Sequence, residues 1–166
     1  QVGVACGTLN HVFSRKVYSV ALNGELVGEL GLNAALAGYF GVPVVLVTGD
    51  EALVQEARSL LGDVETVAVK RAYGTTAARC LAPSRVHTLI KEAATRAVQK
   101  TAQHPFVVSP PIVLTVGFQQ TAHAELAELV PGSRRLDGRT VEFRHEDMHT
   151  VYRAWRAMVN LAGMAE

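Results

Sequence analysis

The sequence predicts an α/β fold in which the end of a parallel α/β layer is followed by a smaller two-layer α+β lobe. Between residues 15 and 70, strand-like and helix-like segments alternate with short connections, which is typical of a parallel layer. After residue 83, long helices alternate with short strands and one hairpin, which favours an α+β sandwich. The periodicity fades between residues 71 and 83. We therefore expect residues 1–75 to form the C-terminal part of an α/β domain and residues 76–166 to form the α+β lobe.

The first elements are a hairpin and a helix. Residues 15–22 alternate well enough for a strand, and Asn23-Gly24 is the dipeptide typical of a type I′ turn, in which both central residues have positive φ. Residues 30–40 then change to helical spacing and end at a Gly-Val-Pro stop. The apolar stripe predicted for this helix consists of Leu32, Ala35, Leu36 and Tyr39.

A strand, a helix and a further strand follow. Residues 43–50 read as a short buried strand that ends in Thr48, Gly49 and Asp50. Asp50 can cap the helix over residues 51–61, and Gly62 can end that helix. Residues 64–70 read as the next strand. Since ligands bind at the carboxyl ends of parallel strands, we expect binding groups near Thr48 to Asp50.

The second half contains three helices and three strands. Ser84 is the predicted cap of a long helix over residues 85–100, and residues 110–118 read as a strand. The remaining predicted elements are a helix over 122–130, strands over 134–136 and 140–145 around Asp137-Gly138, and a last helix from Asp147 to Met164.

Composition excludes several classes of protein. With 166 residues, 49% of them hydrophobic, the chain can bury a core. Sixteen Lys and Arg nearly balance fifteen Asp and Glu, so no strong field attracts nucleic acid or anionic lipid. The longest apolar runs, Val42–Val47 and Ile112–Val116, are far shorter than the roughly 18 residues of a membrane helix. Cys6 and Cys80 form no disulfide framework, so we expect a reducing cytoplasm and free thiols that are at least partly buried.

A short H-E-x-x-H match spans His145 to His149. That motif binds zinc when both histidines lie one turn apart on one helix, with the glutamate between them as general base. Here His145 ends a predicted strand and Asp147 resembles a helix cap, so we favour a helix start with solvated histidines. We assign no function to His87, His104 and His123, which lie apart in sequence.

The segment LVGELGLNAALAG, residues 26–38, holds a single charged residue, Glu29. Burying an unpaired carboxylate is very costly, so Glu29 either reaches solvent at a helix start or has a cationic partner. Asn33 lies four residues later and shares a helix face with Glu29. His11 lies in the loop GTLNHVFS, just before the first strand. From the residues alone, both explanations of Glu29 remain open.

The run GTLNHVFSRKVYSVALNGELVGELGLNAALAGYFGVPVVLVTGD, residues 7–50, is similar to the central segment of the DppA-type zinc D-aminopeptidases. The likeness continues through VKRAYGTTAARCLAP and RTVEFRHEDMHTVYRAW, and so covers nearly the whole chain. The resemblance implies a cytoplasmic metallopeptidase that releases N-terminal D-amino acids from short peptides. It also implies two zinc ions per active site and a ring-shaped homo-oligomer.

Three residues take roles from this resemblance. Glu29 matches the family's glutamate ligand to zinc, for which oxygen contacts of about 2.0–2.2 Å are expected. His11 matches the catalytic histidine and would act as acid and base or stabilise a developing oxyanion. We infer that Asn33 orients Glu29 or a ligand water. Zinc would polarise the scissile carbonyl and lower the pKa of a bound water to about 7.

The family's other ligands are an Asp-x-Glu pair and two histidines that precede the G-T-L-N-H-like segment. They have no counterpart in a chain that starts at Gln1. Since one carboxylate cannot hold two metals, we expect this chain alone to be incomplete or inactive. It would be the C-terminal part of a longer enzyme, one of two polypeptides, or a product without catalysis. The alternative function is a non-catalytic oligomerisation or peptide-binding domain.

Overall fold

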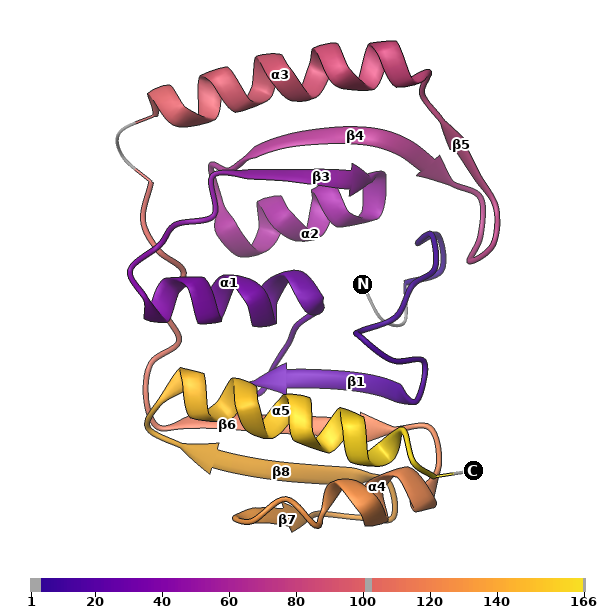
Figure 1. Cartoon of the computed structure of the whole chain (residues 1–166), viewed down its shortest axis with the longest axis vertical. Helices are drawn as coiled ribbons and strands as arrows, with labels where there is room; N and C mark the ends of the chain where they lie inside the picture. The colour runs from indigo at the N-terminus through magenta and orange to yellow at the C-terminus, as the bar shows by residue number, and fades with distance from the viewer. Residues whose placement is uncertain (1–3, 101–102, 166) are drawn as a thin grey trace.

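The computed structural model describes residues 4–100 and 103–165, and within them the chain forms two sheets and five helices (Figure 1). The first three residues of the predicted α/β part lie outside this description. The helices are α1 (Glu29–Tyr39), α2 (Glu51–Leu61), α3 (Pro83–Gln99), α4 (Thr121–Ala127) and α5 (Met148–Ala162). The mixed α/β class predicted from the sequence is confirmed.

The larger sheet has the strand order β2-β1-β6-β8-β7, and all its neighbouring pairs are antiparallel. Its strands are β1 (Val17–Leu22), β2 (Glu25–Leu26), β6 (Ile112–Phe118), β7 (Ser133–Arg135) and β8 (Thr140–His145). The smaller sheet has the order β3-β4-β5 and consists of β3 (Leu46–Asp50), β4 (Glu65–Ala72) and β5 (Ala78–Cys80).

The predicted hairpin at Asn23-Gly24 is confirmed. Leu22 of β1 pairs with Glu25 of β2, and the two turn residues have φ values of 51° and 85°. Glycine adopts such a positive φ without strain, and asparagine tolerates it better than most other residues. The turn therefore fixes where β1 ends and where the chain turns toward α1.

The parallel layer is smaller than the sequence predicts. Only β3 and β4 pair in parallel among the described strands, whereas β1 is antiparallel to β6, with Val20 opposite Val116. The sequence-based placement of the first strand in the parallel layer is therefore wrong. Its buried residues belong to the same core as α5, and alternation along one strand does not specify which strand lies beside it. The proposed division of the chain at residues 75 and 76 stays a prediction.

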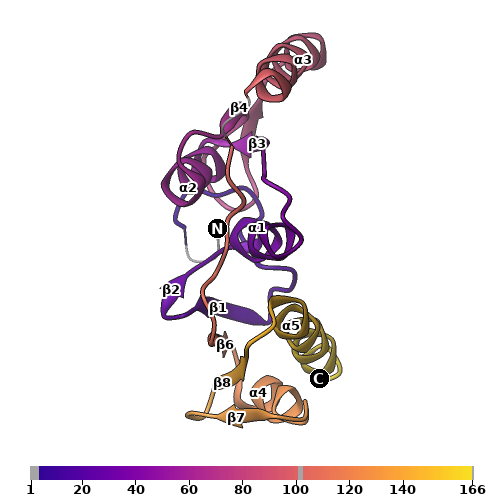
Figure 2. The ribbon, with the colours of Figure 1, turned by 90° about the vertical axis from the view of Figure 1, so that its left-hand side faces the viewer.

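The larger core lies between the five-stranded sheet and the helices α4 and α5, which cover one face of it (Figure 2). Trp155, Phe118 and Leu114 are among its fully buried side chains. This two-layer α+β arrangement contains the elements β6, α4, β7, β8 and α5 that the sequence placed in the second lobe, and in addition β1 and β2, which the sequence placed in the first part. A second, smaller cluster contains Val47 and Ala57 and fixes α2 against β3. Helix α1 packs against α5, so it lies between the two sheets (Figure 1).

The helix ends show which capping residues in the sequence correctly predicted where a helix begins or ends. Asp50 caps α2 by accepting a hydrogen bond from the Leu53 N–H at 2.9 Å, and Gly62 ends that helix with φ 67°, as predicted. Asp147 caps α5 through the Thr150 N–H. The predicted cap at Ser84 is wrong, because α3 already begins at Pro83. Proline suits the first helical turn, where its missing N–H would have no partner in the helix.

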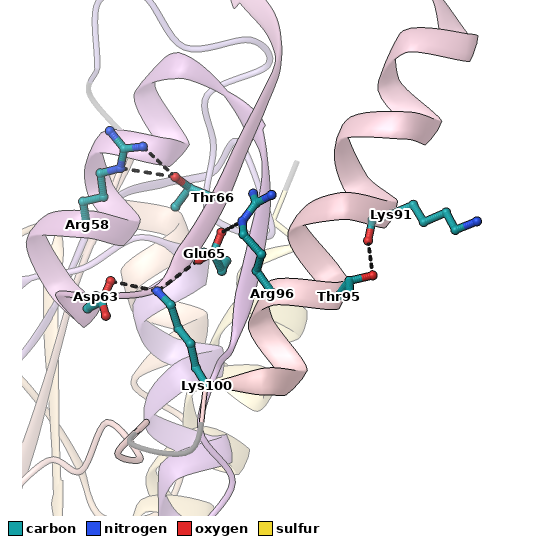
Figure 3. Close-up of polar contacts among 8 residues, drawn as sticks. All are labelled: Arg58, Asp63, Glu65, Thr66, Lys91, Thr95, Arg96 and Lys100. Carbon is teal, nitrogen blue, oxygen red and sulfur yellow. Dashed lines mark hydrogen bonds and ion pairs between the residues drawn. The ribbon is translucent and has the colours of Figure 1, made fainter.

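Ion pairs link the C-terminal end of helix α3 to the small sheet (Figure 3). Arg96 and Lys100 both bind the carboxylate of Glu65 on β4, at 3.2 and 3.0 Å. The Lys100 ammonium, and then Arg96, hold the pKa of Glu65 below its usual value. Only Ala93 and Ala97 of this helix are buried.

The β5 strand, which the sequence predicted as a plain connection, consists of exposed residues at the sheet edge.

Two predictions of burial are corrected. Tyr39 was expected in the apolar stripe of α1, but the residue is 46% exposed and its hydroxyl donates to Asp147. Cys6 and Cys80 are free thiols, as predicted, but both are exposed. Over the residues described here, no helix combines the length and the apolar character needed to cross a bilayer.

Candidate functional site

Glu29 is the first residue of α1 and its side chain is exposed. Gly28 precedes it and has no side chain to cap the helix, so Glu29 places its charge beside the N–H groups of the first turn, where a negative charge is stabilised. One carboxylate oxygen accepts a hydrogen bond from the Phe13 N–H at 3.0 Å. The carboxylate thus has a fixed orientation although it is accessible.

The loop that contains His11 is tied to the small sheet at the end where β3 and β4 finish. The Thr8 N–H donates to the Asp50 carboxylate at 2.8 Å, at the carboxyl end of β3. The Leu9 N–H donates to the Thr75 carbonyl oxygen at 2.8 Å, in the turn between β4 and β5. Asp50 therefore serves as helix cap and as loop anchor. The expectation that binding groups lie near Thr48 to Asp50 stays a prediction.

The backbone around His11 is conformationally strained. Leu9 and Phe13 both have positive φ, at 50° and 59°, which is uncommon for residues with bulky side chains. Val12, which lies between these two residues in the sequence, is fully buried and anchors the loop to the larger core. Strain of this kind persists where the surroundings impose it, and it is frequent at functional sites.

His11 itself is exposed, and its Nδ1 contacts the carbonyl oxygen of Leu9. A ring nitrogen that faces a carbonyl oxygen carries the proton, so the neutral ring has its basic nitrogen at Nε2. Phe13, two residues after His11, makes the hydrogen bond to Glu29. The structure thus brings the His11 loop and the start of α1 together through one backbone contact.

Asn33 lies on the exposed side of α1, one turn after Glu29, as the spacing predicts. Its Oδ1 accepts a hydrogen bond from the Tyr152 hydroxyl of α5 at 2.8 Å. The predicted roles of Glu29, His11 and Asn33 in metal binding and catalysis stay predictions.

Helix α5 contributes residues that the sequence reasoning missed. The Arg156 guanidinium lies over the Phe13 ring, 3.8 Å from its centroid, one turn after Tyr152. Tyr39, at the other end of α1, donates to Asp147 at 2.5 Å. Mainly because of this hydrogen bond, the pKa of Asp147 falls to about 2. Tyr152 and Arg156 are four residues apart, as are Glu29 and Asn33. The sequence alone does not relate these two pairs, and only the packing of α1 against α5 does.

The H-E-x-x-H match does not form a zinc site of the helical kind. His145 is the last residue of β8, and its Nδ1 accepts a hydrogen bond from the Asp147 N–H at 3.0 Å. His149 lies in α5, with its ring 5.9 Å from that of Phe40. The predicted strand end and helix cap are confirmed, so the two histidines do not share a helix face.

Among the residues of the candidate site, Glu29 is suited to be one zinc ligand. A glutamate oxygen is a common zinc donor, and ligating carboxylates are usually oriented by a hydrogen bond such as that from Phe13. Across residues 4–100 and 103–165, no group of three or more His, Cys, Asp or Glu side chains is arranged to hold a metal ion.

The chain resembles known peptidases over most of its length. Residues 1–157 match the peptidase family M55, described as D-aminopeptidase. A curated D-aminopeptidase of Bacillus subtilis (strain 168) is 37% identical over 158 residues, which are 94% of this chain and 58% of that protein. The present chain therefore spans little more than half the length of this relative.

The fold also matches a solved structure. The Zn-dependent D-aminopeptidase DppA from Bacillus subtilis, described as a self-compartmentalizing protease, superposes with a TM-score of 0.94 at 36% identity. The match covers 99% of this chain and 60% of that one. On the family match and on this identity across almost the full sequence, the chain belongs to the D-aminopeptidase family of M55 peptidases.

Proposed function

We propose that this chain carries part of the active site of a zinc-dependent D-aminopeptidase, which releases N-terminal D-amino acids from short peptides. The hydrogen bond between the Phe13 N–H and the Glu29 carboxylate is the observation that carries the proposal. It joins the proposed ligand to the loop of the proposed catalytic histidine. The similarity to proteins described as D-aminopeptidases supports the substrate class.

Each residue has a defined task in this proposal. Glu29 offers a carboxylate oxygen to zinc, while the Phe13 N–H keeps the carboxylate from rotating away. His11, with its proton on Nδ1, presents Nε2 to take up a proton from the attacking water or to return it to the leaving amine. Zinc, when bound, polarises the scissile carbonyl and acidifies a bound water. Asn33, whose Oδ1 accepts the Tyr152 hydroxyl, orients Glu29 or a ligand water from the next turn of α1.

The metal content, the oligomeric state and the cellular location are proposed from the solved relative and from the free cysteines. A zinc cofactor and assembly into a homo-oligomer are proposed, since the relative is described as Zn-dependent and self-compartmentalizing, and two zinc ions per active site are proposed from the family resemblance. The two exposed free thiols, Cys6 and Cys80, support a cytoplasmic location, because reducing conditions preserve thiols.

One observation favours a different function, a non-catalytic oligomerisation or peptide-binding domain. Glu29 is exposed at a helix start, where the helix dipole and water suffice to stabilise a carboxylate without a metal. The two functions differ in what Glu29 does, so replacement of this residue distinguishes them.

The test is Glu29→Gln in the complete natural polypeptide loaded with zinc. Glutamine keeps an acceptor for the Phe13 N–H but loses the charge that binds zinc. We expect zinc content to fall together with kcat/KM for D-aminoacyl peptides, the latter by about a hundredfold or more. Metal analysis by mass spectrometry and steady-state kinetics measure both.

Two variants serve as controls. Glu25→Gln removes an exposed carboxylate from β2 and should change neither zinc content nor rate. His149→Ala should leave the activity largely intact, because His149 and His145 do not share a helix face. If Glu29→Gln retains full zinc and full activity, another site holds the zinc and the role proposed for Glu29 is wrong, whereas an unchanged polypeptide without zinc-dependent activity would support the non-catalytic function.

A further inference from the structure

We propose that Arg156 of α5 is a positioning residue for the active site, which acts by holding Phe13 so that its N–H points at Glu29. This inference rests on the proposed function. It adds a residue 127 positions away from Glu29 in the sequence, on an element that supplies neither the proposed ligand nor the proposed catalytic histidine.

The first support is the contact itself. The Arg156 guanidinium carbon lies 3.8 Å from the centroid of the Phe13 ring, well inside the range for an attractive cation–π contact. Phe13 is 41% exposed, so apolar burial alone does not fix its ring. Without Arg156, the ring would lose the contact on this face.

The second support is the backbone of Phe13. Its φ of 59° lies in the left-handed region, which a bulky residue adopts only when its surroundings enforce it. In this conformation the N–H donates to the Glu29 carboxylate at 3.0 Å. A side-chain contact that stabilises the conformation therefore also stabilises the hydrogen bond.

The third support is the arrangement of α1 and α5, which lie side by side and run in opposite directions (Figure 1). Three contacts follow one another along this pair. Tyr39 meets Asp147, Asn33 meets Tyr152 one turn further along α5, and Glu29 meets Arg156 through Phe13 after one more turn. Arg156 thus occupies the position on α5 that corresponds to the start of α1.

The fourth support is the environment of the arginine. Its Nε is buried and has no hydrogen-bond partner, which is unusual for so polar an atom. Among the described residues, no hydrogen bond at Nε orients the guanidinium, whereas its contact with the Phe13 ring does.

The first experiment measures positioning without zinc. Amide hydrogen exchange at Phe13 is followed in the protein, in Arg156→Ala and in Phe13→Leu, which keeps an apolar side chain but removes the ring face. Both variants should exchange roughly tenfold faster at residue 13, as expected for loss of a partly desolvated cation–π contact. Arg153→Ala, which removes an exposed arginine of the same helix, should leave that rate unchanged.

The second experiment measures catalysis in the complete zinc-loaded polypeptide. Arg156→Ala should lower kcat about tenfold and change KM by less than about twofold, because the loop of His11 is displaced while substrate contacts remain. Arg156→Lys should restore part of kcat. In the double variant with Phe13→Leu, the two losses should not add, because both remove the same contact.

Each other outcome overturns the inference. A raised KM at constant kcat would make Arg156 an anchor for the substrate carboxylate. A lower melting temperature with unchanged kcat and unchanged exchange at residue 13 would make it purely structural, and additive losses would separate it from Phe13. If the unchanged polypeptide itself shows no zinc-dependent peptidase activity, the proposed function fails, while the exchange experiment still decides the role of Arg156.

Discussion

Asp50 shows how a single buried carboxylate can serve two parts of the chain. One oxygen accepts the Leu53 N–H and so starts α2, and the other accepts the Thr8 N–H and so fixes the loop of His11. Asp50 is only 3% exposed. The loop geometry near the candidate site therefore depends on a residue whose sequence signature is that of an ordinary helix cap.

Replacement of Asp50 by Ala is expected to affect both partners. Loss of the cap costs about 1 kcal/mol of unfolding free energy, and the orphaned Thr8 donor adds about 1 kcal/mol or more. Denaturant unfolding measures the sum, and amide exchange at Thr8 should accelerate. Asp147→Ala is the matched control, since it removes a helix cap that has no contact with the Thr8 N–H. Unchanged protection of Thr8 in the Asp50 variant would contradict the anchoring role.

Between elements, the pairing of α1 with α5 has a consequence for acid stability. Hydrogen bonds from Tyr39 and from the Thr150 N–H lower the pKa of Asp147 from 3.8 to about 2, with the Tyr39 bond as the largest cause. A carboxyl whose pKa is lower in the folded state stabilises the fold above its unfolded pKa. This contribution is lost as the pH falls from about 4 through about 2.

Tyr39→Phe should therefore flatten the pH dependence of stability. The unfolding free energy of the unchanged protein should fall more steeply between about pH 4 and pH 2 than that of the variant. Urea titrations at several pH values measure both slopes. Tyr73→Phe removes a hydroxyl from another exposed tyrosine and should keep the original slope. Equal slopes for Tyr39→Phe and the unchanged protein would show that this hydrogen bond does not contribute.

The parts that the sequence predicted well depend on local chemistry. Asn23-Gly24 specifies its turn, and Asp50 and Asp147 specify two helix starts, because each acts on residues within one helical turn or one hairpin. The face shared by Glu29 and Asn33 follows from helical spacing alone. Within the candidate site, Glu29 and His11 were proposed from a resemblance, since a single exposed glutamate or histidine carries little information by itself.

The parts that were missed depend on contacts between distant segments. Nothing in the alternation of β1 states that Val20 lies opposite Val116, and nothing near Phe13 states that Arg156 covers its ring. The three residues of β5 are exposed and show no alternation, so they read as a loop. Such features become visible only when the sheet order and the helix pairing are known.

For the chain as a unit, the two sheets meet around α1, and the proposed site lies where this helix begins. The loop of His11 contacts the small sheet through Asp50 and Thr75, while Glu29 and Asn33 are linked to α5 of the large sheet. Elements attached to both sheets thus contribute to the proposed site. This arrangement explains why the residues nearest to the proposed chemistry come from distant parts of the sequence.

Anomalous diffraction at the zinc edge, on crystals of the complete zinc-loaded polypeptide, tests the role of Glu29 most directly. We predict a zinc ion about 2.0–2.2 Å from a carboxylate oxygen of Glu29, with the Phe13 N–H still bound to that carboxylate. A zinc peak elsewhere, with the Glu29 carboxylate surrounded by solvent and the His11 ring remote from the metal, would contradict the proposal.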